Sequence, residues 1–369
     1  MNIWFYNPDN DMALANGDKN FVSPLAIQKM SDDLVPMFEH IKFDGDKIFY
    51  NVNDLDSRNI VNAKAFVWGW SPAVLNFIKS LPIEFLNLPS EDDINYLRDI
   101  SHRKTSIEIL KSLNIYDSDY PLPQLPILCS EIEEISVMFD NQEKFILKSP
   151  WSSSGKGIIW SKQNTKQNLL NRAKNILNKN RSIIIEKEFD KIIDFGALFY
   201  ADENGSVSFY GFSLFNTDIN GIYRGNVLAS NEDIKQIITS FINRELLDNT
   251  ICMLIPILKK ILNNKYTGFF GIDMMIYKDC NIFHLHPCIE LNLRMTMGVV
   301  ASMLYKNIIK EGRGDFKIDF FKKSGDALNW HNNMIEQYKH HNILNNKYSK
   351  YLNLTPVDDN TSYIAYILY

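Results

Sequence analysis

The chain has 369 residues, of which 45% are hydrophobic and 22% charged, with a formal net charge of −5. This length and composition are typical of a globular protein of two or three domains, and the acidic balance disfavours a general nucleic-acid-binding protein. No run of about 18 apolar residues predicts a membrane span, the N-terminus carries no basic leader, and the four cysteines have no CxxC spacing, so we expect a cytoplasmic protein with reduced thiols.

Short apolar strands alternate with helices across residues 1–100. We expect strands at 3–6, 47–50 and 65–68 and helices at 12–15 and 73–79. Such alternation is typical of a parallel sheet, in which ligands bind beyond the carboxyl ends of the strands. The turns at 7–17 and 68–71 are therefore candidate edges of a substrate site, with plain caps and turns as the alternative.

A helix is expected over 101–113, and it opens with Arg103 and Lys104. Basic residues at a helix start are unfavourable to the helix dipole. One of the two is therefore expected to contact an anion, although a solvated basic pair explains the pattern equally well.

A buried strand at 145–150 carries Lys148 and runs into a Ser/Gly-rich turn at 151–157, followed by a strand at 158–160. Backbone N–H groups of such a turn can surround phosphate oxygens, and a lysine in an apolar strand needs a partner. The pattern is not a Walker A loop, which requires a following helix. An ordinary hairpin is the alternative.

Further along, a helix is expected at 164–178 and a strand at 182–189 that ends in a charged hinge, where Glu186 and backbone groups are suited to adenine. A hairpin is expected from strands at 194–200 and 207–215, followed by a polar loop at 221–226 and one or two helices over 234–263. After the segment considered next, we expect a helix at 299–310, a segment at 315–321, a helix at 327–347 and a terminal strand at 363–369.

Strands at 268–277 and 282–294, joined by a polar turn, form the segment that carries most chemistry. Asp273 lies in the first strand, and Glu290 and Asn292 lie two apart in the second, so the latter two share a face. Three oxygen ligands on a sheet suit Mg²⁺. Arg294 brings a cation to the same face. The alternative is an ordinary ion pair between Glu290 and Arg294.

The order of these features resembles the ATP-grasp superfamily over roughly residues 100–300. The resemblance implies a mixed α/β (α+β) fold with the nucleotide between two lobes. An N-terminal α/β (pre-ATP-grasp) domain would occupy 1–100, a first lobe with the phosphate loop 101–190, a second lobe with the metal site 191–310, and a helical and strand extension 311–369.

The resemblance also implies roles for individual residues. The α- and β-phosphates would contact Lys148 and either Arg103 or Lys104. The triphosphate loop would comprise Ser152, Ser153, Ser154, Gly155, Lys156 and Gly157. Adenine would bind Glu186 and the backbone of Lys187 and Phe189, ribose would bind Asp194, and Mg²⁺, with Mn²⁺ as an alternative, would bind Asp273, Glu290 and Asn292.

Arg294 matches the arginine that holds a carboxylate or bicarbonate in biotin-carboxylase-like members. Two departures disfavour a D-alanine ligase: Gly271 stands where many ligases have arginine, and Leu293-Arg294 stands where a Pro-Gly turn is usual. Arg224 is a candidate replacement for the absent charge, and Asn226 beside it is a further candidate substrate contact.

The implied activity is ATP-dependent activation of a carboxylate as an acyl phosphate, with Lys148 and Arg294 as catalytic groups. An amine or another nucleophile, such as a thiol, then displaces phosphate. The implied partners are small molecules, with neither nucleic acid nor membrane, and a homodimer is an open option. A catalytically silent nucleotide-binding protein and a kinase-like enzyme are the alternatives.

Overall fold

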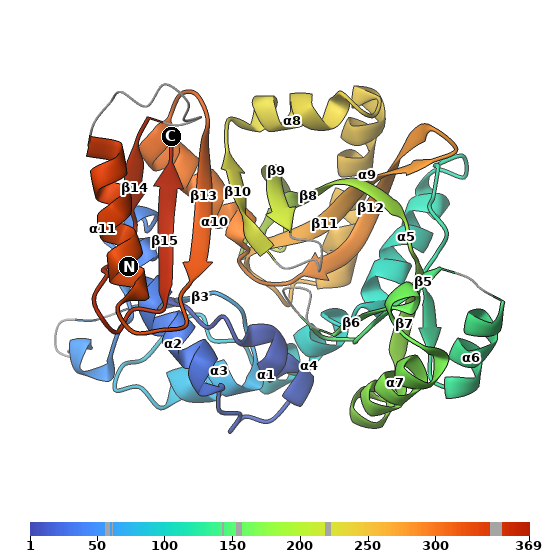
Figure 1. The fold of residues 1–369 in the computed structure, drawn as a ribbon. Helices are drawn as coiled ribbons and strands as arrows, with labels where there is room; N and C mark the ends of the chain where they lie inside the picture. Colours follow the sequence, from blue (N-terminus) through green and yellow to red (C-terminus); the bar gives the residue numbers. More distant parts are fainter. Residues whose placement is uncertain (56–59, 61, 142–143, 153–156, 218–222, 340–348) are drawn as a thin grey trace.

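The computed structural model describes residues 1–55, 60, 62–141, 144–152, 157–217, 223–339 and 349–369 and contains three β-sheets (Figure 1). The N-terminal sheet has the strand order β2-β1-β3 and is parallel throughout, as the alternating pattern predicts. Its strands are β1 Asn2–Phe5, β2 Lys47–Ile48 and β3 Lys64–Val67, and its helices are α1 Asn10–Asn16, α2 Leu25–Leu34, α3 Pro72–Lys79 and α4 Glu91–Ile100.

Helix α4 lies in a stretch for which no helix is predicted from the sequence. Its N-terminus has a capping box, in which the Asp93 N–H donates to Ser90 Oγ and the Ser90 N–H donates to Asp93 Oδ2, both at 3.1 Å. This motif is the sequence signal that identifies the helix. Because α4 ends at Ile100, the helix predicted from residue 101 begins instead at Lys104, and α5 spans Lys104–Tyr116.

The second sheet has the order β4-β7-β5-β6, with antiparallel neighbours. Its strands are β4 Ile127–Cys129, β5 Phe145–Lys148, β6 Ile158–Trp160 and β7 Ile183–Lys187. Helices α6 Ile132–Asp140 and α7 Lys166–Asn180 pack against each other and against a core of strand residues that includes Phe145 and Leu147. We refer to this unit as the first lobe.

The third sheet has eight strands in the antiparallel order β12-β11-β8-β9-β10-β13-β15-β14. Its strands are β8 Asp190–Ala201, β9 Val207–Thr217, β10 Tyr223–Leu228, β11 Gly268–Asp279, β12 Ile282–Asn292, β13 Gly314–Phe320, β14 Tyr351–Asn353 and β15 Tyr363–Leu368. We call this sheet and its helices the second lobe. The C-terminal strands thus continue the sheet that carries the predicted metal ligands.

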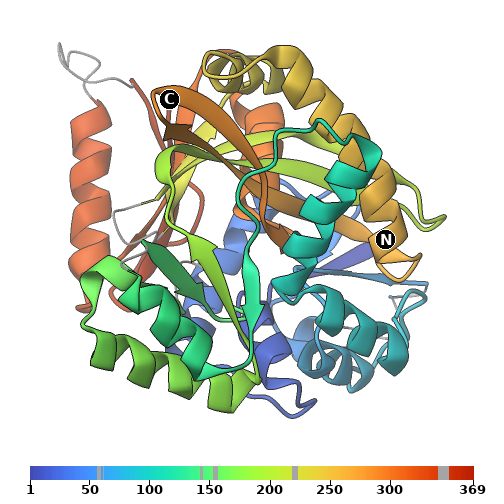
Figure 2. The same ribbon diagram turned by 90° about the vertical axis from the view of Figure 1, so that its right-hand side faces the viewer.

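Helices cover both faces of the large sheet. On one face lie α8 Asn231–Thr239 and α9 Arg244–Leu262, and α5 packs against α9 and β12, as Figure 2 shows. On the other face, α10 Met297–Leu304 shares a core with N-terminal residues such as Trp4 and Phe38. This shared core seats the N-terminal domain against the second lobe. None of the helices in the described part of the chain has the length and apolar character that a membrane span requires.

Two predicted segments differ from the structure. Residues 223–226, predicted as loop, belong to β10, where Asn226 pairs with Phe215 of β9 and with Phe316 of β13. Asn226 can occupy this central position because its amide forms hydrogen bonds with Ser213 and Tyr223 inside the sheet. The helix predicted to residue 347 is α11 Asp326–Lys339, and residues 340–348 lie outside the described part.

Candidate active site

The hairpin of β11 and β12 places the three predicted metal ligands on one face. Asp273 lies directly opposite Glu290, and Asn292 lies opposite Gly271. Directly opposed residues of antiparallel strands have their Cβ atoms about 4.5–5.5 Å apart, and the Asn292 amide is near enough to act on the pKa of the Asp273 carboxyl, in the lowering direction. The structure therefore brings together the three oxygen-bearing side chains that the two-residue spacing predicts.

The two carboxyls of this hairpin resist ionisation. Burial, reinforced by the facing Glu290, raises the pKa of Asp273 to about 7, and burial also raises the pKa of Glu290. A divalent cation between them would remove this penalty. In the described residues no three His, Cys, Asp or Glu side chains form a ligand group. Two carboxylates and an amide nevertheless fit Mg²⁺, which commonly completes its shell with water and phosphate oxygens.

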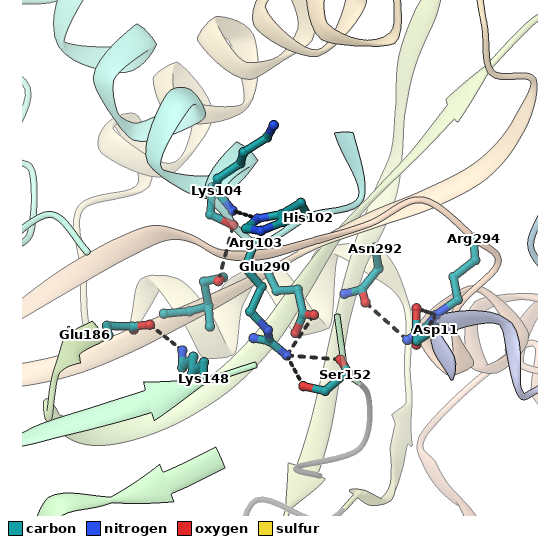
Figure 3. A network of polar contacts seen from close by, with 12 residues as sticks. Asp11, His102, Arg103, Lys104, Lys148, Ser152, Glu186, Glu290, Asn292 and Arg294 are labelled. Atoms are coloured by element: carbon teal, nitrogen blue, oxygen red, sulfur yellow. Dashed lines mark hydrogen bonds and ion pairs between the residues drawn. The ribbon is translucent and has the colours of Figure 1, made fainter. Parts of the chain in front are cut away.

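Arg103 joins the first lobe to this hairpin. Its Nη2 lies 2.9 Å from Glu290 Oε1 and donates to the backbone oxygen and Oγ of Ser152, at 3.1 and 3.2 Å (Figure 3). Its Nε is buried and has no hydrogen-bond partner among the described residues. Lys104 instead pairs with Asp99 at 2.6 Å, where the Lys104 side chain is half-buried and the Asp99 side chain is exposed. Of the two basic residues, the structure therefore brings Arg103 to the carboxylates.

Lys148 and Glu186 form a buried ion pair across β5 and β7. Their side chains are 7% and 5% exposed, so each supplies the partner that a buried charge requires. Burial is the largest influence and would raise the pKa of Glu186, but Lys148, His286 and Arg103 together outweigh it and hold that pKa below the usual range. The predicted phosphate lysine and the predicted adenine acid are thus in contact.

The predicted phosphate loop is only partly described. Ser152 contacts Arg103, whereas Ser153, Ser154, Gly155 and Lys156 lie outside the described residues. Gly157 has a φ of +81° and its carbonyl accepts from the Ser149 N–H at 3.0 Å. This left-handed conformation favours glycine, and it returns the chain to β6.

The predicted hinge connects the two lobes. Lys187 ends β7 with an exposed side chain whose Nζ lies 3.6 Å from an Asp279 oxygen. Phe189 packs on Tyr277, with ring centroids 4.5 Å apart. Asp194 lies on β8 two positions before Gly196, the partner of Asp273, so both acids lie on the same face. Asp194 pairs with Lys191 and accepts a hydrogen bond from Thr217 at 3.2 Å.

Arg294 follows β12 and contacts the N-terminal domain. Its Nε lies 3.1 Å from Asp11 Oδ2, and its Nη2 donates to Asn292 Oδ1 at 3.2 Å (Figure 3). The next residue, Met295, donates its N–H to the Trp68 carbonyl at 2.7 Å. Both N-terminal turns predicted as site edges therefore reach this segment. Asp11 itself is not among the predicted site residues, and its position in the 7–17 turn is the signal that could have identified it.

The candidate substrate contacts on β10 have a different setting. Asn226 is buried, donates to Ser213 Oγ at 2.7 Å and accepts a hydrogen bond from the Tyr223 hydroxyl. These hydrogen bonds give the Asn226 amide a structural role within the sheet. Arg224 is exposed on the same strand.

In comparisons with known proteins, this chain matches solved structures but no known sequence. No family model and no curated protein sequence matches the chain. N5-carboxyaminoimidazole synthetase from Staphylococcus aureus, solved with ADP, superposes with a TM-score of 0.52 at 13% identity, over 100% of this chain and 92% of its own. Biotin carboxylase from Campylobacter jejuni, solved as a β,γ-ATP complex, gives a TM-score of 0.51 at 11% identity, over 100% of this chain and 86% of its own.

Carboxyaminoimidazole ribonucleotide synthase from Aspergillus clavatus, solved with ATP, gives a TM-score of 0.50 at 13% identity, over 100% and 93%. This chain has the ATP-grasp fold. The predicted fold is thereby confirmed. At identities of 11–13% the likeness concerns the ATP-grasp fold alone, so the activity is argued from the residues of the site.

Proposed function

We propose that this protein is an ATP-dependent ligase that activates a carboxylate as an acyl phosphate and joins it to an amine, releasing ADP and phosphate. The observation that carries the proposal is the single face on which Asp273, Glu290 and Asn292 meet, with Arg103 and Arg294 bonded to two of them. This arrangement gathers the anion-binding and cation-binding groups that phosphoryl transfer needs.

The nucleotide would lie between the two lobes. Arg103 and Lys148, whose side chains are nearly buried, would hold its α- and β-phosphates, and the hinge at Glu186 and Phe189 would hold the base. Each cation already pairs with an acid, Arg103 with Glu290 and Lys148 with Glu186. Phosphate oxygens would therefore share or replace carboxylate partners that are present within the protein.

Asp273, Glu290 and Asn292 would hold Mg²⁺, with Mn²⁺ as an alternative. A cation held by these residues would supply neutralisation of phosphate charge during phosphoryl transfer. The chain's own contribution is to fix the three ligand oxygens on a rigid hairpin. Arg103 joins Glu290 to Ser152, the first residue of the predicted phosphate loop.

Arg294 would orient the acid substrate. A guanidinium binds a carboxylate through two parallel N–H bonds, and one oxygen of that carboxylate would attack the γ-phosphorus while ADP leaves. The amine would then attack the acyl carbon and expel phosphate. Arg294 contacts both Asn292 and Asp11, so the acid would lie at the junction of the second lobe and the N-terminal domain.

The test is a phosphate-release screen with ATP, Mg²⁺ and pools of amino acids, sugar acids and small diacids, each with and without amines, followed by mass spectrometry. We expect ADP, phosphate and an amide in one pool, and none of these products from the Glu290→Gln variant. A stable phosphoester in place of an amide would identify a kinase-like enzyme. Phosphate release in no pool would contradict the ligase and favour a silent nucleotide-binding protein.

A further inference from the structure

His286 is a buried histidine of β12 that the proposed reaction does not use. Its side chain is 0% exposed, and neither ring nitrogen hydrogen-bonds another residue in the part of the chain that the structure describes. Buried polar groups nearly always have a hydrogen-bond partner. An imidazole held in this way, four positions before Glu290, therefore requires a physical reason.

The Glu186 carboxylate lies within ion-pair distance of this imidazole. His286 Nε2 lies 3.9 Å from Glu186 Oε1, while the other oxygen, Oε2, binds the Lys148 ammonium. One carboxylate from the first lobe thus lies between a lysine of its own lobe and a histidine of the second lobe. The distance of 3.9 Å is too long for a hydrogen bond but short enough that a small shift would form one.

The remaining surroundings of His286 are mostly uncharged. Met275 of β11 lies opposite it, and the Phe189 ring of the hinge packs edge-on with centroids 5.4 Å apart. The charged groups that act on it are Glu186 from β7 and Lys148 from β5. Arg103, which precedes α5, acts in turn on Glu186. Burial lowers the pKa of His286 to about 4, so its imidazole is neutral at neutral pH.

We propose that nucleotide binding protonates His286, which then replaces Lys148 as the principal counter-charge of Glu186. This inference rests on the proposed phosphate role of Lys148. When the ammonium turns from Glu186 toward phosphate oxygens, a carboxylate that is 5% exposed loses its main cation. A buried unpaired charge is costly, and His286 is the group positioned to supply the compensation.

The step transfers one proton. A buffer molecule in the solvent gives up this proton, and the lone pair of His286 Nε2 accepts it. The new N–H bond then points to Glu186 Oε1. When the nucleotide is released, the proton returns to the buffer. No other covalent bond changes. His286 is thus a positioning residue that keeps Glu186 in place beside the base while Lys148 is engaged with phosphate.

The sign of the pH dependence follows from linkage. The pKa of His286 would be higher in the complex than its value of about 4 in the free protein. Between these two pKa values the complex holds one more proton on His286, so the contribution of His286 to binding grows as pH falls. As pH rises through the higher value the gain is lost, with a slope of up to about tenfold in affinity per pH unit.

The experiment is calorimetric titration of the full chain with Mg²⁺ and the non-hydrolysable β,γ-imido analogue of ATP. Measurements at pH 6 and pH 7 in PIPES and in imidazole, whose ionisation enthalpies differ, give the number of protons taken up. We expect wild type to take up as much as one proton more than His286→Gln, and His284→Gln to match wild type. His284 is the control because it lies on the same strand, two positions away and partly exposed.

The outcomes separate this inference from the proposed function. If wild type binds the analogue with the same proton count as His286→Gln, the inference is overturned while the nucleotide site stands. If wild type does not bind, the proposed function fails. If His286→Gln does not fold, the histidine ring resonances of wild type at pH 6 provide the test. One of the seven histidines is expected to shift to its protonated position when the analogue binds. The absence of such a shift would overturn the proposal.

Discussion

The guanidinium Nε of Arg294 lies 3.1 Å from a carboxylate oxygen of Asp11, and this ion pair joins the end of the metal-ligand hairpin to the first helix of the N-terminal domain. Both side chains retain some exposure, 16% and 21%. A carboxylate substrate entering at this junction would meet the arginine and its competing acid together. The pair therefore gives two separate predictions.

Arg294→Ala should lower ligase turnover by about 10²–10³-fold, because the variant loses a donor aimed at the charge that develops on the acid. Nucleotide affinity, measured by calorimetry, should be largely unchanged, since no nucleotide role falls to this residue. Arg244→Ala is the matched control: that arginine forms an exposed ion pair with Glu232 at 2.9 Å. Near-normal ligation by Arg294→Ala would remove the carboxylate role.

Asp11→Asn should lower the KM for the acid substrate without raising kcat, because the amide no longer competes for the guanidinium as an anion. Steady-state kinetics with the acid varied at saturating ATP measures the effect. A higher KM in this variant would contradict the prediction and would mean that Asp11 holds the substrate itself.

Lys148→Ala should weaken nucleotide binding and also lower the free energy of unfolding by about 3 kcal/mol, because Glu186 is left buried without its main counter-charge. Calorimetry and urea unfolding measure the two effects. Adding Glu186→Gln to Lys148→Ala should restore much of the stability but not the affinity. Wild-type affinity in Lys148→Ala would argue against the phosphate role.

The hairpin carboxyls predict a pH-dependent response to Mg²⁺. Because Asp273 has a folded-state pKa of about 7, above the unfolded value, its contribution to stability falls as pH rises from about 4 to about 7. Mg²⁺ binds the ionised form and should offset this loss. The increase in Tm on adding MgCl₂ should therefore be larger at pH 8 than at pH 6, and Asp273→Asn should abolish the difference. An increase independent of pH would place the cation elsewhere.

Asn226→Ala should lower the free energy of unfolding by about 1–3 kcal/mol, because it leaves buried hydroxyl partners such as Ser213 without their hydrogen bonds. Nucleotide affinity and the KM for the acid should not change. A raised KM with unaltered stability would restore Asn226 as a substrate contact.

Much of the site could be predicted from local patterns. Side chains two apart on a strand share a face regardless of the rest of the fold, so Glu290 and Asn292 must point to the same side of the sheet. A lysine in an apolar strand demands a partner, and Lys148 has one in Glu186. Local spacing also predicts the turns at 7–17 and 68–71, both of which contact the 294–295 segment.

Other features were decided only by tertiary packing. The choice of Arg103 over Lys104 depends on which side chain of the α5 start meets β12, and the pairing of Asp11 with Arg294 joins residues 283 positions apart. Residue patterns report interactions over a few positions, where backbone geometry limits the options. Contacts over hundreds of positions depend on how whole sheets pack, so the partner of each site charge was set by the fold.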